Sequence, residues 1–207
     1  DADGNSYETV EIGNQCWLKE NLKTTKYRDG SIINNIRNYD EWIQYTSDGY
    51  AWFNNDSNNK DIYGALYNRK AVASSHDLCP TGWHVPTMEE FLTLRDNVGP
   101  NNANALKATG TPPYWFWTND TEPTNSSGFS ARGAGRRDGV NGGFKRLQEY
   151  TYFWSSTGGL AYQDMPTAHA LYLAYNSNTI KLSTTSAFST EVGFAGAYGF
   201  SVRCIKD

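Results

Sequence analysis

The strongest constraint on the fold is one well-delimited helix signal in a chain that glycine, asparagine and proline interrupt almost everywhere else. Thr87 precedes Glu90 by three residues, which is the spacing of a capping box at a helix start. The apolar stripe that follows comprises Met88, Phe91, Leu92 and Val98. Gly99-Pro100 then ends the pattern, because proline cannot continue a helix. We therefore predict a helix over 87–98.

Weaker patterns complete the expected set of elements. Apolar residues recur at helical spacing over 63–72, and a brief helical piece is expected over 103–108. A hairpin is expected around the turn Gly13-Asn14. The strand candidates are Tyr152–Ser156, Ala168–Tyr175, Thr179–Leu182 and Phe200–Ile205. Because strands and helices do not alternate regularly, the pattern favours an α+β fold with antiparallel pairing. Without a repeat or linker, residues 1–207 are predicted to form a single domain.

Composition excludes several classes of partner. Aromatic residues make up 14% of the chain and charged residues 19%, so a folded core built on rings is expected. The net charge is −4, and the one dense basic cluster is Arg132, Arg136, Arg137, Lys145 and Arg146 within glycine-rich sequence, so nucleic-acid binding is not expected. No apolar run reaches about 18 residues, so this domain is not expected to insert into a membrane. Because Asp1 is not an initiator residue, we expect a trimmed mature domain, compatible with an upstream signal or lipid anchor.

The three cysteines are Cys16, Cys79 and Cys204, and their spacing fits no zinc site. An odd number allows at most one disulfide within the chain. Cys79 precedes Pro-Thr-Gly-Trp and Cys204 lies in the closing strand candidate, so Cys79–Cys204 is the expected pair. The alternative is three buried, reduced thiols.

Catalytic patterns are missing from the sequence. There is no G-x-S-x-G elbow, no phosphate-binding loop and no dinucleotide fingerprint. A dyad of Cys79 and His84 is disfavoured because prolines and a glycine make that segment a tight turn. The adjacent carboxylates of Glu89 and Glu90 lie in the first turn of the expected helix, where they interact favourably with the helix dipole, so a catalytic pair is not the better interpretation. For the glycines of 133–143, loop flexibility or tight strand packing is a better interpretation than a phosphate cradle. We expect a protein that is not an enzyme and that has no cofactor or metal.

Six segments in order resemble the Fibrobacter succinogenes major paralogous domain, a family of bacterial surface and secreted domains. They are 10–24 (VEIGNQCWLKENLKT), 63–68 (YGALYN), 78–87 (LCPTGWHVPT), 127–131 (SGFSA), 153–157 (FWSST) and 199–204 (GFSVRC). The resemblance implies a C-type-lectin-like fold, related to that of formylglycine-generating enzymes, in secreted proteins and lipoproteins of Bacteroidetes and Fibrobacteres. Its ligands are mostly undefined.

Two departures from related patterns are informative. Cys16 stands where the family often has an apolar residue, which supports its being the unpaired cysteine. Calcium-dependent lectins use Glu-Pro-Asn or Gln-Pro-Asp before Trp-Asn-Asp, whereas here Trp117-Thr118-Asn119-Asp120 comes before Glu122-Pro123-Thr124. Calcium-mediated sugar binding is therefore not expected. Nor can the cysteine pair or metal site of the fold's enzymes be mapped onto this chain.

The segment 158–198 is the expected binding region, since its small and amphipathic side chains suit a display surface, which some relatives diversify. Alternation along its central strand puts Leu171 and Leu173 on the core face and Tyr172 on the other face. His169 shares the leucine face, where a core role is the commoner outcome. The candidate ligand-binding residues are Tyr162, Asp164, His169, Tyr172, Asn176, Asn178, Phe188 and Tyr198.

These observations predict a secreted or cell-surface domain, monomeric and non-catalytic, that binds an extracellular glycan or protein through its loops and residues 158–198. The alternative is a structural or tip module of a bacterial surface assembly. An enzyme of the formylglycine-generating type would need a reactive cysteine and is disfavoured.

Overall fold

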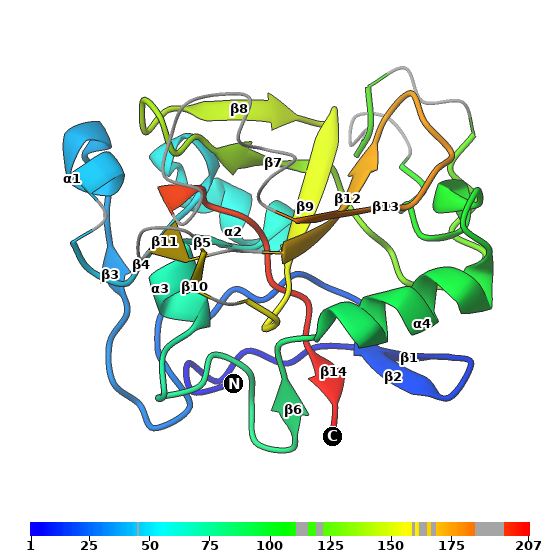
Figure 1. Ribbon diagram of the computed structural model, residues 1–207, viewed down its shortest axis with the longest axis horizontal. Helices are drawn as coiled ribbons and strands as arrows, with labels where there is room; N and C mark the ends of the chain where they lie inside the picture. Colours follow the sequence, from blue (N-terminus) through cyan, green and yellow to red (C-terminus); the bar gives the residue numbers. More distant parts are fainter. Residues whose placement is uncertain are drawn as a thin grey trace.

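A computed structural model gives the fold as a set of small sheets gathered around the C-terminal end of the chain (Figure 1). It describes residues 1–44, 46–110, 116–118, 122–158, 160–161, 165–166, 169–184 and 197–207. The helices are α1 (Tyr39–Gln44), α2 (Lys60–Tyr63), α3 (Arg69–Val72) and α4 (Met88–Val98), with 3₁₀ turns at Phe53–Asn55, Ser57–Asn59 and Ala103–Ala105. The elements confirm the expected mixture of helix and mainly antiparallel strand.

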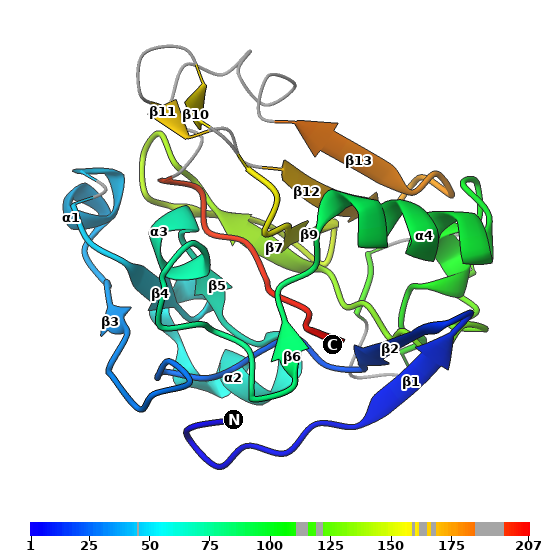
Figure 2. The same cartoon turned by 60° about the horizontal axis from the view of Figure 1, so that its bottom comes forward.

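The largest sheet has the order β13-β12-β9-β7-β8. Its strands are β7 (Ala134–Arg137), β8 (Phe144–Leu147), β9 (Tyr150–Trp154), β12 (His169–Ala174) and β13 (Lys181–Thr184). Helix α4 lies along one face of this sheet (Figure 2). Phe91 and Leu94 of the helix are buried there with Phe153, Leu171 and Leu173 of the sheet. Burying these rings and leucines from both layers stabilises the pairing of helix and sheet.

Three smaller sheets complete the fold. One has the order β1-β2-β14-β6, with β1 (Thr9–Ile12), β2 (Gln15–Leu18), β6 (Trp83–His84) and β14 (Ile205–Lys206). Another joins β3 (Asn34–Asn35), β4 (Gly49–Ala51) and β5 (Leu66–Tyr67), and the last pairs β10 (Leu160–Ala161) with β11 (Met165–Pro166). Strands β1 and β2 form the expected hairpin, with Ile12 opposite Gln15 across the Gly13-Asn14 turn.

The chain from 199 to 205, which we call the closing segment, runs through the middle of the molecule (Figure 1). Its backbone forms hydrogen bonds with the backbone of Arg137 in β7, of Tyr67 in β5, and of Tyr152 and Trp154 in β9. Further along it bonds residues 18 and 22 and pairs with β2 and β6. One extended segment therefore joins the three larger sheets.

Arg203 anchors the closing segment from within the core. The side chain is 1% exposed and donates hydrogen bonds to the carbonyls of Leu18 and Phe129 and to the Asn21 Oδ1 atom. Its guanidinium also lies 4.5 Å from the centre of the Phe129 ring. Burial lowers the pKa of Arg203 to about 9, so the side chain stays charged at neutral pH. The charge is held by carbonyl and amide oxygens and by ring faces, because no carboxylate of the described residues pairs with it.

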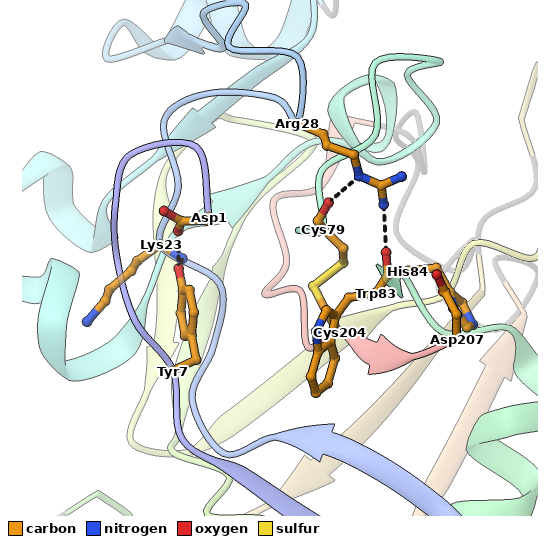
Figure 3. The surroundings of a disulfide bond; sticks show 9 residues. All are labelled: Asp1, Tyr7, Lys23, Arg28, Cys79, Trp83, His84, Cys204 and Asp207. Atoms are coloured by element: carbon orange, nitrogen blue, oxygen red, sulfur yellow. Dashed lines mark hydrogen bonds and ion pairs between the residues drawn. A yellow bond between two sulfur atoms is a disulfide. The ribbon is translucent and has the colours of Figure 1, made fainter. Parts of the chain in front are cut away.

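The disulfide joins Cys79 to Cys204, the expected pair (Figure 3). Cys16 is the free cysteine. The bond ties the closing segment to the loop before β6. Arg28 holds the same loop by donating to the carbonyls of Cys79, at 2.9 Å, and Trp83, at 2.7 Å. The loop is therefore fixed to the core by a covalent bond and to the neighbouring chain by a bidentate guanidinium.

Helix α4 confirms the capping box. The Thr87 hydroxyl accepts from the Glu90 amide at 3.2 Å, and the Glu90 carboxylate accepts from the Thr87 amide at 2.7 Å. Gly99 ends the helix as expected. The 103–108 piece is present only as the 3₁₀ turn Ala103–Ala105.

The helix predicted over 63–72 is confirmed only at its end, where residues 69–72 form α3, and it is wrong for 64–68. Gly64 interrupts it at φ +73°, and a Cβ atom there would lie 2.6 Å from the Asn21 Cβ atom, so the position requires glycine. Beyond it the chain is extended, and Tyr67 exchanges two backbone hydrogen bonds with Phe200. Pairing with the closing segment therefore overrides the helical spacing of the apolar residues.

Two other expectations change in part. The Phe200–Ile205 strand is regular only at β14, because the residues before it bond different neighbours in turn. The glycine-rich region 133–143 is not all loop, since β7 crosses it. Gly135 has φ +66°, and a Cβ atom there would lie 2.6 Å from the Lys145 carbonyl oxygen. Tight strand packing is therefore the reason for this glycine.

The disulfide is predicted to make a large contribution to stability. Replacing both Cys79 and Cys204 by alanine opens a link across 125 residues and should lower the free energy of unfolding by about 4–5 kcal/mol. Urea unfolding followed by fluorescence measures this, with Cys16→Ala as the matched control. A loss no larger than that of the control would contradict the assigned role of the bond.

Candidate functional site

The second face of the five-stranded sheet carries a concentration of tyrosines. Alternation along β9 puts Tyr150, Tyr152 and Trp154 on this face, while Phe153 faces α4. On β12, Tyr172 lies directly opposite Tyr152, and on its other side it lies opposite Lys181 of β13. The register of three strands therefore brings these side chains into one row.

The tyrosine rings stack on one another along the row. The centre of the Tyr152 ring lies 5.9 Å from that of Tyr150 and 5.7 Å from that of Tyr172, with interplanar angles of 10° and 27°. On the core side Phe200 of the closing segment stacks on Tyr152 at 4.7 Å. Stacked pairs at these separations add to the free energy of burial. The closing segment thus supports the middle ring of the row.

Three cations lie against the three rings. Lys181 Nζ lies 5.6 Å from the centre of the Tyr172 ring, and the Arg146 guanidinium lies 5.5 Å from that of Tyr150. The Arg136 guanidinium lies 5.8 Å from the centre of the Tyr152 ring. All are within the range of cation–π attraction. We call Tyr150, Tyr152, Tyr172, Arg136, Arg146 and Lys181 the tyrosine–cation row.

Arg146 differs from the other residues of the row in its backbone conformation. Its φ is +68°, in the left-handed region that non-glycine residues rarely adopt. It lies in β8 beside Gly135 of β7, which also has a positive φ. In this conformation the guanidinium reaches both the Tyr150 ring and Glu149 Oε2, at 2.8 Å.

A buried carboxylate, that of Asp138, lies beside the cations of this sheet face. Asp138 is fully buried and pairs with both Lys145, at 3.0 Å, and Arg136, at 3.4 Å. Burial alone would raise the pKa of Asp138, but hydrogen bonds from the Val140 amide and Lys145, together with nearby cations, lower it. Asp138 therefore stays ionised, and two cations share its charge.

Tyr152 is protonated at neutral pH. Burial raises the pKa of Tyr152 to about 12, although the neighbouring Arg136 works in the opposite direction. Its hydroxyl is therefore a neutral donor and acceptor. Because its side chain is only 4% exposed, the hydrogen-bond donors that the row can present to an acceptor-rich ligand are those of Tyr150, Tyr172 and the exposed cations.

Of the predicted site residues, the structure places Tyr172 in the tyrosine–cation row and Tyr198 in the core. Tyr172 is half-buried in the row, as alternation predicted, while Leu171 and Leu173 are in the core. Tyr198 is 2% exposed and packs on Phe200, so its assignment to an exposed binding surface is wrong. The closing segment draws this ring inward because Phe200 beside it is buried.

The remaining predicted residues do not join the row. His169 is half-buried at the start of β12, and its carbonyl accepts from the Ser155 amide. The backbone and side-chain oxygens of Asn178 accept hydrogen bonds from the amides of Ala103 and Asn104. These bonds give Asn178 a structural role. Asn176 is exposed at the turn before β13. Tyr162, Asp164 and Phe188 lie outside the described residues.

Sequence reasoning missed five residues of the row: Tyr150, Tyr152, Arg136, Arg146 and Lys181. The expected strand began at Tyr152, although the alternation of YTYFW over 150–154 already includes Tyr150. The basic cluster that contains Arg136 and Arg146 was noticed in the sequence but not assigned to the site, because its cations reach the rings only through the pairing of the strands.

A second polar cluster lies at the opposite end of the molecule, around His84 of β6 (Figure 3). His84 lies between two carboxylates, with Glu90 Oε1 2.8 Å from Nε2 and Asp207 Oδ1 2.6 Å from Nδ1. Burial lowers the pKa of His84, but hydrogen bonds with Asp207 and Glu90 outweigh it and the net shift is upward.

An open groove beside this cluster is lined by Glu11, Cys16, Glu90 and Lys206 among others. Burial, and then the neighbouring Glu11 carboxylate, raise the pKa of the Cys16 thiol. A raised pKa disfavours the nucleophilic thiolate. Cys79 is oxidised in the disulfide, so the Cys79–His84 dyad has no free thiol.

Within the described ranges, no group of three or more His, Cys, Asp or Glu side chains is arranged to hold a metal ion. Among those same residues, no helix has the length and apolarity needed to cross a bilayer.

The fold and this surface define a disulfide-bonded α+β domain with a tyrosine- and cation-rich sheet face. The family of the Fibrobacter succinogenes major domain matches residues 10–206, so the chain belongs to that family. No curated protein matches the chain, and no solved structure does.

The raised pKa of His84 predicts a pH-dependent contribution to stability. A group whose pKa is higher in the folded state stabilises the fold most below its unfolded value of about 6.5, and this is lost as pH rises through the folded value. The free energy of unfolding of the wild type, minus that of His84→Gln, should therefore shrink between about pH 6 and pH 9.

Urea unfolding of both proteins at several pH values measures this difference. Groups that titrate in both proteins cancel in the subtraction. A difference that stays constant over the range would contradict the charged clamp around His84.

Proposed function

We propose that the domain is a non-catalytic binding module that recognises a glycan or protein through the tyrosine–cation row. The observation that carries this proposal is the registered alignment of three stacked tyrosines with three cations over one sheet face. Tyrosine and arginine are the residue types enriched where binding energy concentrates, since they offer rigid contact area together with hydrogen-bonding groups. Part of the row, Tyr172 and Lys181, belongs to the segment 158–198 that sequence composition singled out.

The proposal of a non-catalytic role rests on the state of the cysteines and on the sequence. Two cysteines are joined in a disulfide, and the third has a raised pKa. The sequence contains no nucleophile elbow and no phosphate-binding loop. These features argue against acyl-transfer, thiol and nucleotide chemistry.

A secreted or cell-surface location and a C-type-lectin-like fold are part of the same proposal. The disulfide supports the location, because such bonds persist in oxidising compartments outside the cytosol. Short antiparallel sheets with one main helix, closed by the C-terminal segment, are compatible with that fold. An alternative role as a tip or spacer in a surface assembly would bury the same face against a neighbouring subunit.

The proposal predicts that Tyr172→Ala removes binding without unfolding the domain. A glycan array of bacterial and plant polysaccharides should identify a ligand, and the variant should bind it at least about tenfold more weakly, equivalent to ~1.4 kcal/mol. The matched control is Tyr39→Ala, because Tyr39 is 51% exposed and lies outside the row.

Circular dichroism and thermal melting report whether each variant is folded. Equal loss in both variants would contradict a site at the row, and so would full binding by folded Tyr172→Ala. If no saccharide binds and the domain self-associates in sedimentation experiments at high concentration, the assembly role replaces the binding role.

A further inference from the structure

One cation of the row, Lys181, differs from several other lysines of the chain in having no carboxylate partner among the described residues. Lys19, Lys23 and Lys26 each lie within ion-pair distance of a carboxylate. Lys181 is exposed and, among the residues that the structure describes, contacts the Tyr172 ring but no carboxylate. A cation against a ring face keeps its charge uncompensated and available to an anion.

The neighbouring cations are only partly compensated as well. Lys145, 43% exposed, shares the single charge of Asp138 with Arg136. Arg146 is 54% exposed and pairs with Glu149 through one of its terminal nitrogens. Among the residues that the structure describes, the face therefore presents three exposed cations, Lys145, Arg146 and Lys181, beside the carboxylates of Asp138 and Glu149, although the whole chain has a net charge of −4. Such a local excess of one sign attracts ligands of the opposite sign.

The charges are spread across the sheet. Lys181 lies on β13 and Arg146 on β8, which are the two outer strands of the five. With about 4.8 Å between neighbouring strands, the two backbones are on the order of 15–20 Å apart. Rings of Tyr172, Tyr152 and Tyr150 occupy the space between them. A matching ligand must carry negative charges at intervals along an extended chain.

The exposed groups also select for hydrogen-bond acceptors. The stacked rings and the cations already cover much of the ring faces. Side chains stand roughly perpendicular to a sheet, so the phenol ends point away from it. The Tyr150 hydroxyl makes no hydrogen bond within the described part of the chain. What the face offers a ligand is therefore hydroxyl, ammonium and guanidinium donors more than bare ring faces.

From this arrangement we propose that the ligand of the tyrosine–cation row is an acidic glycan, a polysaccharide that carries carboxylate or sulfate groups. The inference rests on the proposed binding function and names its ligand class. Anionic groups pair with Lys181 and Arg146 at the two ends, and sugar hydroxyls accept from and donate to Tyr150 and Tyr172 between them, while the buried Tyr152 supports both rings. Charges separated by uncharged sugar rings match cations separated by tyrosines.

An acidic peptide is the main competitor, and the geometry favours the glycan. An extended peptide binds a sheet by adding a strand at an edge, which uses main-chain groups. The row instead takes side chains from all five strands, with Tyr152, Tyr172 and Lys181 directly opposite one another, so it needs a ligand that binds through substituents along its length.

The test compares charge-reversal variants on defined polymers. The probes are polygalacturonate, dextran sulfate, neutral dextran and poly-glutamate, with binding measured by calorimetry. The variants are Lys181→Glu and Arg146→Glu, and the matched control is Lys206→Glu, an exposed lysine on β14 in a different sheet. We expect wild type and control to bind an acidic polysaccharide and each row variant to bind it at least about tenfold more weakly.

Two further readouts separate specific binding from general attraction between charges. Affinity should fall with added salt, as paired charges require. Tyr150→Phe, which keeps the ring and removes one hydroxyl, should weaken binding about three- to tenfold, as loss of a single hydrogen bond does. Equal effects of Lys206→Glu and Lys181→Glu would overturn the inference.

The outcomes distinguish the inference from the proposed function. If a neutral glycan binds, depends on Tyr172 and is indifferent to the charge reversals, the binding function stands and the acidic-glycan inference fails. Tighter binding of poly-glutamate than of both acidic polysaccharides overturns the inference in favour of a peptide. If no polymer binds to the folded wild type, both proposals fail.

Discussion

The structure depends on the closing segment, residues 199–205, because its backbone hydrogen bonds join the three larger sheets. No two of those sheets are continuous with each other, so their relative position depends on what passes between them. Three side chains fix the segment. Arg203 donates hydrogen bonds to the carbonyls of Leu18 and Phe129, and Cys204 is covalently bonded to Cys79. The Phe200 ring packs against the Trp154 ring, with 4.2 Å between the ring centres. A buried cation without a carboxylate partner is costly unless its donors are satisfied, and here carbonyl oxygens and ring faces provide the compensation.

The candidate site follows from the same constraint. Phe200 stacks on Tyr152, which forms the middle of the tyrosine stack, and Gly199 pairs with Arg137 of the strand that carries Arg136. The closing segment therefore supports the row from below, while the pairing of β12 and β13 adds Tyr172 and Lys181. Binding groups built on paired strands are held more rigidly than groups on loops, which lowers the entropy lost on binding. This is the physical link between the way the chain closes and the function proposed for it.

Features that depend on neighbours in sequence could be predicted, and features that depend on long-range pairing could not. The capping box of α4 and the hairpin at Gly13-Asn14 are local, and both were predicted correctly. The disulfide is a long-range exception: the count of cysteines allowed at most one bond, and the positions of Cys79 before Pro-Thr-Gly-Trp and of Cys204 in the closing strand candidate indicated the pair. Residues 63–72 have helical spacing, but Tyr67 pairs with Phe200 and forces the chain to extend. In the site, alternation placed Tyr172 correctly. Its contact with Lys181 depends on the pairing of β12 with β13, which alternation alone does not give, and Tyr198 is drawn into the core by Phe200.

The central claim is that an acidic glycan lies across the tyrosine–cation row, and chemical-shift mapping tests it most directly. A ¹⁵N-labelled domain titrated with a short oligogalacturonate reports which backbone amides sense the ligand. The account predicts shifts concentrated on β8, β9, β12 and the start of β13, with none from a neutral oligosaccharide of the same length. Shifts concentrated instead around the groove of Glu11 and Lys206, at the far end of the molecule, would contradict it.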